Sequence, residues 1–224
     1  MTETVAPGAP EALVECMLRV AALGLSRGTS GNASQRSARG MWITPTGLPP
    51  AAMRADDIVE VGLDGSVLAG AHRPSSEWPM HVAIYRARPD ARAIVHCHSR
   101  HATALACCGR DIPAFHYMVA VAGGDSIRCA PYALFGSAEL AAHAVAALAG
   151  RKACLLANHG QIALGSTLDT ALALALEVEE LAAQYGAALA LGGPALLGGA
   201  AMGEVIQKFS GYGQPRPATS DDEE

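Results

Sequence analysis

Helical and strand-like segments alternate along most of this 224-residue chain, and this alternation constrains the fold more than any other feature. Apolar spacing, caps and chain breakers predict helices over residues 11–23, 79–88, 99–108, 137–148 and 167–191. Short apolar runs predict strands over residues 41–44, 58–63, 66–69, 91–98, 127–130 and 152–157. Interleaved helices and strands indicate an α/β layered domain. Because Asp64-Gly65 predicts a hairpin, the sheet should be mixed or antiparallel.

Composition excludes several classes of protein. Half of the residues are hydrophobic and only 4% are aromatic, so we expect a core of Ala, Leu and Val. The net charge of -5 comes without any basic block, which argues against nucleic acid or an anionic membrane as the main partner. The most apolar long segment, 168–191, contains three glutamates, so no membrane span is expected. The six cysteines form no CxxC pair and the N-terminus shows no secretory pattern, which favours a cytoplasmic protein with reduced thiols.

The two ends of the chain differ from its middle. The first eight residues carry Gly, Pro and Thr without periodicity, and the segment after residue 213 is Pro-rich and then acidic. Such ends are typically solvated. We therefore predict one domain over residues 1–213 and a flexible acidic tail over residues 214–224.

The strongest chemical signal is the segment His96-Cys97-His98 at the end of a predicted strand. Alternate strand residues point to the same face, so His96 and His98 could bind one cation. The segment Asn158-His159-Gly160 directly follows the buried run 152–157, and His159 could join the pair from a neighbouring strand. Three histidines and one exchangeable position are the usual arrangement of a catalytic zinc, although a packed histidine pair remains an alternative. We interpret the other histidines as structural or surface residues: His72, His81, His101, His116 and His143.

Three segments carry groups suited to an anion. Ser75 and Ser76 precede Glu77 at the expected start of a helix, where free N–H groups favour phosphate, although Glu77 could simply cap that helix. The glycine-containing loops 28–34 and 44–47 would let backbone N–H groups approach an oxyanion. Neither loop matches a Walker A or dinucleotide-binding pattern, so each alone indicates only a loop.

Taken together, these segments resemble the class II aldolase/adducin family. The resemblance is carried by GNAS (31–34), ITPTG (43–47), SSEW (75–78), HCH (96–98), NHG (158–160) and the longer stretches 112–136 and 204–213. It extends from about residue 11 to residue 213 and is greatest to the aldolases of L-fuculose 1-phosphate. It implies a three-layer αβα domain with a nine-stranded, mostly antiparallel central sheet. It also implies a cyclic homotetramer with sites between subunits.

The resemblance further implies roles for individual residues. His96, His98 and His159 would bind one Zn²⁺ per subunit. Glu77 would be the catalytic acid/base and would also ligate the metal when substrate is absent. The phosphate-binding residues would be Gly31, Asn32, Thr46, Gly47, Ser75 and Ser76. Tyr117 would be a catalytic residue acting from the neighbouring subunit, and Phe135 and Tyr212 would lie near the aldehyde end.

The implied activity is the zinc-dependent, reversible cleavage of a ketose 1-phosphate, such as L-fuculose 1-phosphate, to dihydroxyacetone phosphate and an aldehyde such as lactaldehyde. The only lysines, Lys152 and Lys208, have no setting for a Schiff base, which agrees with a metal-dependent reaction. Asn158 and Gln161 depart from the family pattern near His159. The aldehyde end could therefore suit a 5-deoxypentulose or methylthiopentulose 1-phosphate instead.

Three other functions share parts of this pattern. A pentulose-phosphate 4-epimerase would use the same metal site, but the epimerase pattern has Asp at the position of Glu77. A methylthioribulose-phosphate dehydratase would share the histidines, and the stretch 112–136 argues against both enzymes. A non-catalytic interaction module like the adducin head would lack the zinc ligands, all of which this sequence contains.

Overall fold

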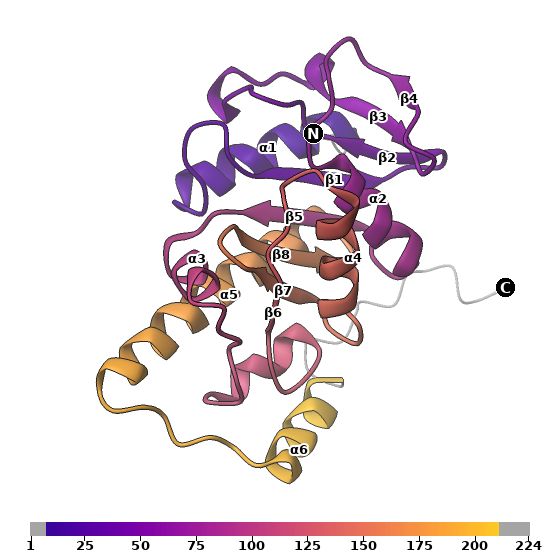
Figure 1. Ribbon diagram of the computed structural model, residues 1–224. Helices are drawn as coiled ribbons and strands as arrows, with labels where there is room; N and C mark the ends of the chain where they lie inside the picture. The colour runs from indigo at the N-terminus through magenta and orange to yellow at the C-terminus, as the bar shows by residue number, and fades with distance from the viewer. Residues whose placement is uncertain (1–7, 211–224) are drawn as a thin grey trace, which may run out of the picture.

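The computed structural model describes residues 8–210, and these form an α/β fold around a single sheet (Figure 1). The strand order is β4-β3-β2-β1-β5-β8-β7-β6. The strands are β1 (Asn32–Arg36), β2 (Gly40–Ile43), β3 (Val59–Gly62), β4 (Val67–Ala69), β5 (Ala93–Cys97), β6 (Arg128–Ala130), β7 (Ala153–Leu156) and β8 (Gly160–Gly165). The helices are α1 (Ala9–Ala22), α2 (Trp78–Ala87), α3 (Arg100–Cys107), α4 (Ala138–Ala147), α5 (Leu168–Ala190) and α6 (Gly199–Ser210). Short 3₁₀ segments are η1 (Pro50–Ala52), η2 (Ala55–Asp57) and η3 (Tyr117–Ala122).

The sheet is mixed, which corrects the nine-stranded, mostly antiparallel sheet that the family resemblance implied. The described residues form eight strands, and β6 pairs with β7 in parallel while the other neighbours run antiparallel. The parallel pair arises because α4 lies between β6 and β7 and returns the chain to the same end of the sheet. Pro45 and Pro74 form only an isolated bridge, since proline has no N–H to extend a ladder.

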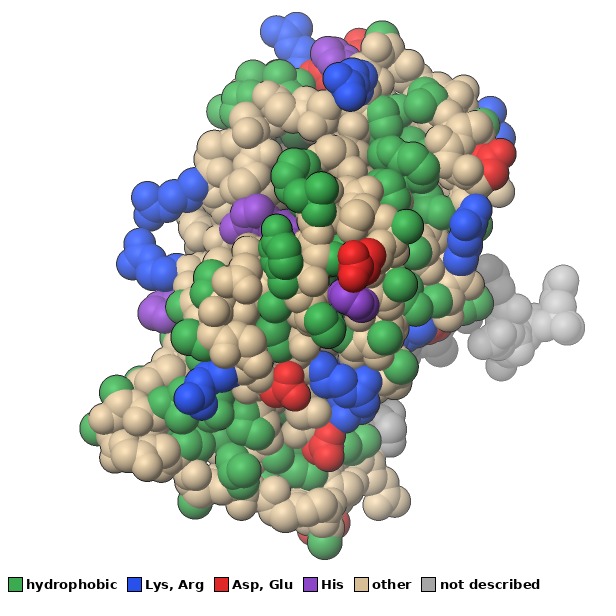
Figure 2. Space-filling view, viewed as in Figure 1, with side chains coloured by type: hydrophobic (Ala, Val, Ile, Leu, Met, Phe, Trp, Pro, Cys, Tyr) green, Lys and Arg blue, Asp and Glu red, His purple; other side chains and the backbone are tan. Residues whose placement is uncertain are grey.

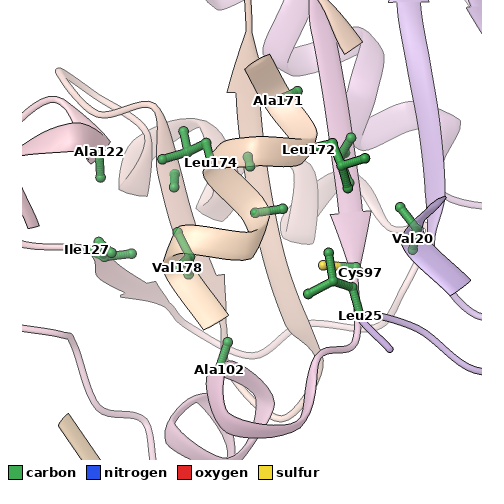
Figure 3. Packing of buried hydrophobic residues seen from close by; sticks show 14 of the residues in the cluster. Val20, Leu25, Cys97, Ala102, Ala122, Ile127, Ala171, Leu172, Leu174 and Val178 are labelled. Atoms are coloured by element: carbon green, nitrogen blue, oxygen red, sulfur yellow. The ribbon is translucent and has the colours of Figure 1, made fainter. Parts of the chain in front are cut away.

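Helices cover both faces of the sheet. On one face, α1, α3 and α5 pack with Ala33, Val95 and Ala163 in a first apolar cluster, part of which Figure 3 shows. On the other face, α2 and α4 pack with residues such as Ile94 and Ile162 in a second cluster. Successive residues of the central strands alternate between the two clusters, as a period of two requires. Strands β1 and β5 can therefore pack on one face and carry polar side chains on the other.

Several elements were not predicted from the sequence. Strand β1 lies partly in the Gly-rich segment that we predicted as a loop, and β8, η3 and α6 were not predicted. Thr167 caps α5, and it forms a capping box with Thr170. The helices predicted over 11–23, 137–148 and 167–191 are confirmed within a few residues at each end.

The surface and the chain ends bear on two further expectations. In Figure 2, Lys and Arg side chains are scattered over the face shown and form no continuous basic patch. Within residues 8–210, no helix is long and apolar enough to cross a membrane. The predicted tail over residues 214–224, the domain boundary at residue 213 and the first seven residues lie outside the described part of the chain.

Candidate active site

Four side chains from three separate segments converge beside the central strands. They are Glu77 at the start of α2, His96 on β5, His98 just after β5 and His159 in the turn between β7 and β8. One ligand atom from each lies within 4.8 Å of all the others. The three imidazole centroids are 4.8 to 4.9 Å apart. The structure therefore brings together all four residues to which the family resemblance assigned a metal.

The pairing of β5 with β8 sets the positions of the histidines. His96 donates its Nδ1–H to the backbone oxygen of Gln161 at 2.9 Å, which leaves its Nε2 as the nitrogen that faces the cluster. His98 lies against Gly160, where an added Cβ would be 2.9 Å from the imidazole Cδ2, so a side chain here would displace the ring. Asn158 adopts a φ of 56°, a left-handed conformation that asparagine tolerates and that helps form the turn carrying His159.

Glu77 occupies the N-cap position of α2, but its side chain makes no capping hydrogen bond. The alternative that Glu77 serves only as a helix cap is therefore wrong. Its Oε2 lies 3.0 Å from His96 Nε2 and accepts a hydrogen bond from Asn32 Nδ2 at 3.0 Å. Its Oε1 lies 3.2 Å from His159 Nε2 and, though buried, has no hydrogen-bond partner among residues 8–210. A buried carboxylate oxygen without such a partner is costly, and a bound cation would remove that cost.

The protonation states suit a metal site. Burial raises the pKa of Glu77, but the charge and hydrogen bond of His96, together with His159 and Asn32, outweigh burial and hold it below the usual value. Burial, with the neighbouring charge of His96, lowers the pKa of His98 and of His159 to about 4. These two imidazoles are thus neutral at pH 7 and have a lone pair for a cation. The donor set of three nitrogens and one carboxylate fits a divalent metal ion such as zinc.

A cavity of about 320 Å³ opens beside the four residues. Its lining includes every residue predicted to bind phosphate: Gly31, Asn32, Thr46, Gly47, Ser75 and Ser76. The loop after β2 and the loop before α2 are held together because Ser75 donates its backbone N–H to Thr44 O at 2.9 Å. Gly31 has a φ of +81°, and an added Cβ would lie 2.6 Å from Ser26 Oγ, so only glycine fits there.

The residues assigned to the aldehyde end and to the neighbouring subunit have different surroundings. Phe135 lines the cavity and is 61% exposed. Tyr132, which sequence reasoning missed, lines it as well. Tyr117 lies elsewhere, on η3, where its ring stacks on Phe209 of α6. One chain alone therefore does not bring Tyr117 to the histidines, and Tyr212 lies outside the described residues.

Asn158 and Gln161, the two residues that depart from the family pattern, have different surroundings in the structure. Asn158 is exposed and lines the cavity. Gln161 instead points to the opposite face of the sheet, where its Nε2 donates to Ser99 Oγ at 2.7 Å and to Ala175 O at 3.0 Å. An effect of the Gln161 side chain on the aldehyde end therefore has no support from its position.

His81, which was interpreted as a structural or surface residue, lies in the interior. It is fully buried one helical turn after Glu77 and hydrogen-bonds to Asn32 and Ser34. Its connection to Glu77 through Asn32 was not predicted. Its spacing of four residues from Glu77 on a predicted helix was the available signal.

Comparison with known proteins decides the family, because residues 11–185 match the family described as the Class II Aldolase and Adducin N-terminal domain. The chain belongs to the class II aldolase and adducin family. A 5-methylthioribulose-1-phosphate/5-deoxyribulose-1-phosphate aldolase of Rhodospirillum rubrum is 52% identical over 201 residues, covering 90% of each chain. The L-fuculose phosphate aldolase of Escherichia coli strain K12 is 47% identical over 202 residues, covering 90% of this chain and 94% of that protein.

A solved structure of an L-fuculose 1-phosphate aldolase shares the class II aldolase fold. Its TM-score is 0.88 at 38% sequence identity, and the match covers 92% of this chain and 98% of that one. The family and these relatives support a metal-dependent lyase of the class II aldolase type. The relatives bear two different substrate names, so a fuculose-specific assignment is not established by similarity.

Proposed function

We propose that this protein is a zinc-dependent aldolase that reversibly cleaves a ketose 1-phosphate to dihydroxyacetone phosphate and an aldehyde. The observation that carries the proposal is the Glu77 carboxylate, held against two of three converging imidazoles beside a cavity lined by glycine and serine loops. The candidate sugars are L-fuculose, 5-deoxyribulose and 5-methylthioribulose 1-phosphate. All three have a ketone beside the phosphate-bearing carbon and an uncharged far end.

The phosphate would be held without basic side chains. Among the described residues that line the cavity there is no lysine or arginine. Ser75 and Ser76 precede Glu77, the N-cap residue of α2, and their hydroxyls and the partial positive charge at this helix end favour a phosphate. Thr46 and Gly47 face the same cavity from the other loop. Binding this remote end would orient the reacting carbons next to Glu77.

The far end of the sugar would lie toward an aromatic part of the rim. Tyr132 and Phe135, 60% and 61% exposed, line the cavity there. A methyl or methylthio group would gain apolar contact with these rings. This rim favours sugars with an apolar terminus without choosing among the three candidates.

Glu77 is the proposed acid/base at the carbon chain. When bound, a divalent ion at the four residues would act as a Lewis acid and stabilise the negative charge that develops as the C3–C4 bond breaks. Glu77 would then deliver a proton to C3, which becomes the hydroxymethyl carbon of dihydroxyacetone phosphate. In the reverse direction it would remove that proton. A carboxylate in such a role typically contributes about 10²–10⁴-fold to the rate.

The second proton transfer would need another copy of the chain. Loss of the C4 hydroxyl proton forms the aldehyde, and Tyr117 is the proposed partner for that proton. Since Tyr117 lies on η3, away from the histidines, it would act from a neighbouring subunit of a homotetramer. Tyr117→Phe should slow cleavage while leaving the metal content unchanged.

Subunit mixing tests this arrangement directly. Glu77→Gln and Tyr117→Phe proteins, each slow alone, should regain activity when dissociated and reassembled together, because some sites would then combine an intact Glu77 with an intact Tyr117. No gain on mixing, or Tyr117→Phe kinetics equal to those of the unmodified protein, would contradict the shared site.

The function itself is tested by assaying the metal-loaded protein with L-fuculose, L-rhamnulose, ribulose, 5-deoxyribulose and 5-methylthioribulose 1-phosphates. Dihydroxyacetone phosphate and an aldehyde should appear for at least one sugar, and a chelator should abolish the reaction. Formation of an epimer without cleavage would indicate the epimerase instead. No turnover of any sugar by protein with stoichiometric zinc would overturn the proposal.

A further inference from the structure

A line of buried polar side chains leads away from Glu77 into the protein. Asn32 Nδ2 donates to Glu77 Oε2 at 3.0 Å, and Asn32 Oδ1 lies 2.7 Å from His81 Nε2. His81 Nδ1 lies 2.7 Å from Ser34 Oγ, which lies 3.0 Å from Tyr85 Oη. Asn32 is 4% exposed, Ser34 and His81 are 0% exposed and Tyr85 is 1% exposed, so water does not compete for these contacts.

The fold places these groups in line for a simple reason. Asn32 and Ser34 are alternate residues of β1 and point to the face that α2 covers. His81 and Tyr85 are one turn apart on α2 and point to that strand. Five polar side chains in an apolar layer are expensive to bury unless every hydrogen bond is made.

Only one arrangement of protons satisfies the whole line. The Glu77 carboxylate can only accept, so the Asn32 amide nitrogen must face it and the Asn32 oxygen must face His81. His81 must then donate from Nε2. Its buried ring is neutral, so Nδ1 accepts from Ser34, whose oxygen accepts from the Tyr85 hydroxyl. Burial lowers the pKa of His81 to about 3, in agreement with a neutral ring.

We infer that His81 is a positioning residue that locks the orientation of the Asn32 amide and thereby holds Glu77 in place for proton transfer. If the amide turned over, its carbonyl oxygen would face the carboxylate, and two acceptors 3.0 Å apart would repel each other. Ser34 and Tyr85 prevent this reversal by fixing which nitrogen of His81 carries the proton. The inference rests on the proposed role of Glu77 as acid/base.

This arrangement fixes Oε2 of Glu77 by a hydrogen bond from Asn32 and leaves Oε1 facing His159 Nε2 at 3.2 Å. Oε2 is held by Asn32, whereas Oε1 has no hydrogen-bond partner in the described structure. A carboxylate anchored at one oxygen can present the other to a substrate carbon without losing its place. Holding a catalytic group in a productive geometry is a recognised source of rate enhancement.

The decisive experiment compares His81→Phe, His81→Gln and Ser34→Ala, with Ile84→Val as the matched control. Ile84 is equally buried on the same helix but belongs to the apolar cluster. For each metal-loaded protein, we would measure zinc content, kcat and KM for cleavage, and solvent deuterium exchange into dihydroxyacetone phosphate. The exchange reports proton transfer at the hydroxymethyl carbon without any aldehyde.

His81→Phe should keep its zinc and its KM, while kcat and the exchange rate fall together by about 10–100-fold. His81→Gln can still donate to Asn32 and should recover most of that loss. Ser34→Ala should show a smaller fall, and Ile84→Val none. Equal activity of His81→Phe and the unmodified protein, loss of zinc in it, or a similar fall in Ile84→Val would each overturn the inference.

A spectroscopic measurement keeps the inference testable if His81→Phe does not fold. Nitrogen-15 NMR of histidine-labelled protein, assigned by difference from His81→Gln, should show His81 protonated at Nε2 only at pH 7. A proton on Nδ1 would overturn the inference. Failure of the unmodified protein to cleave any sugar or to exchange deuterium would instead refute the proposed function, which separates the two failures.

Discussion

The two faces of the central sheet are built from the same strands but serve different purposes. The face toward α1, α3 and α5 is filled mainly by Ala, Val, Leu and Ile side chains. The face toward α2 carries, beside its apolar residues, the buried polar residues Asn32, Ser34, His81 and His96. Alternation along β1 and β5 assigns each residue to one face. The comparison indicates that neighbouring residues of one strand serve different purposes, one contributing to stability and the next to the chemistry of the site.

The largest effect should come from the polar face. Glu77→Gln keeps the size of the side chain but removes the proton-transferring carboxylate, so kcat should fall by about 10²–10⁴-fold while the three imidazoles retain the metal. Steady-state kinetics and metal analysis measure both. Glu60→Gln is the control, because Glu60 on β3 is also buried but pairs with Arg39 instead of the histidines. Comparable losses in the two variants would contradict a specific role for Glu77.

The apolar face should show the opposite behaviour. Leu172 on α5 is 1% exposed, and Leu172→Ala leaves a cavity in the first cluster. The free energy of unfolding should fall by about 2–5 kcal/mol, as measured by urea denaturation, with kcat per folded molecule unchanged. A large loss of kcat in Leu172→Ala protein with native zinc content would contradict the view that the apolar face contributes only to stability.

A smaller effect should appear in the pH dependence of stability. Burial, aided by the charge of His96 and opposed by Glu77, lowers the pKa of His81 from 6.5 to about 3 in the folded protein. Between these values the unfolded chain binds a proton that the folded chain does not, so the free energy of unfolding falls as the pH decreases. From pH 7 to pH 5 this amounts to about 2 kcal/mol.

His81→Gln removes this contribution, so its stability should depend less on pH than that of the unmodified protein. Both proteins would be compared by urea denaturation at pH 7 and pH 5 with a chelator present, since protons also compete with metal at the other histidines. Identical pH dependence in the two proteins would show that His81 is not buried in its neutral form.

The smallest effect is expected at the surface of the apolar side. Arg19 on α1 and Asp169 on α5 form an ion pair whose side chains are 47% and 76% exposed. Exposed pairs of this kind contribute about 0.2–1 kcal/mol, so Asp169→Asn should change stability by less than about 1 kcal/mol and leave catalysis unaltered. Thermal denaturation at low and high salt would measure it. A larger loss would mean that this pair matters more to the docking of α1 than its exposure indicates.

The residues of the candidate site could be predicted from the sequence better than the surrounding elements that position them. His96 and His98 follow from strand alternation, and His159 and Glu77 stand next to recognisable breaks in the chain. Strand β1 did not follow, because Gly31 and Asn32 indicate a loop and only pairing with β2 and β5 makes the segment extended. The spacing of four residues places His81 on the same helix face as Glu77, but its hydrogen bonds to Asn32 and Ser34 depend on the unpredicted strand β1. Likewise, η3 and α6 pack against each other, and this contact joins segments that are distant along the chain.

The three imidazoles belong to segments that meet only through the pairing of β5 with β8 and the turn after β7. An unfolded or partly synthesised chain therefore offers a metal ion at most the two neighbouring histidines. Capture of the ion should be a late event that follows closure of the sheet. A bound ion would link the ends of strands that are distant along the chain, so its removal should loosen this end of the central strands first.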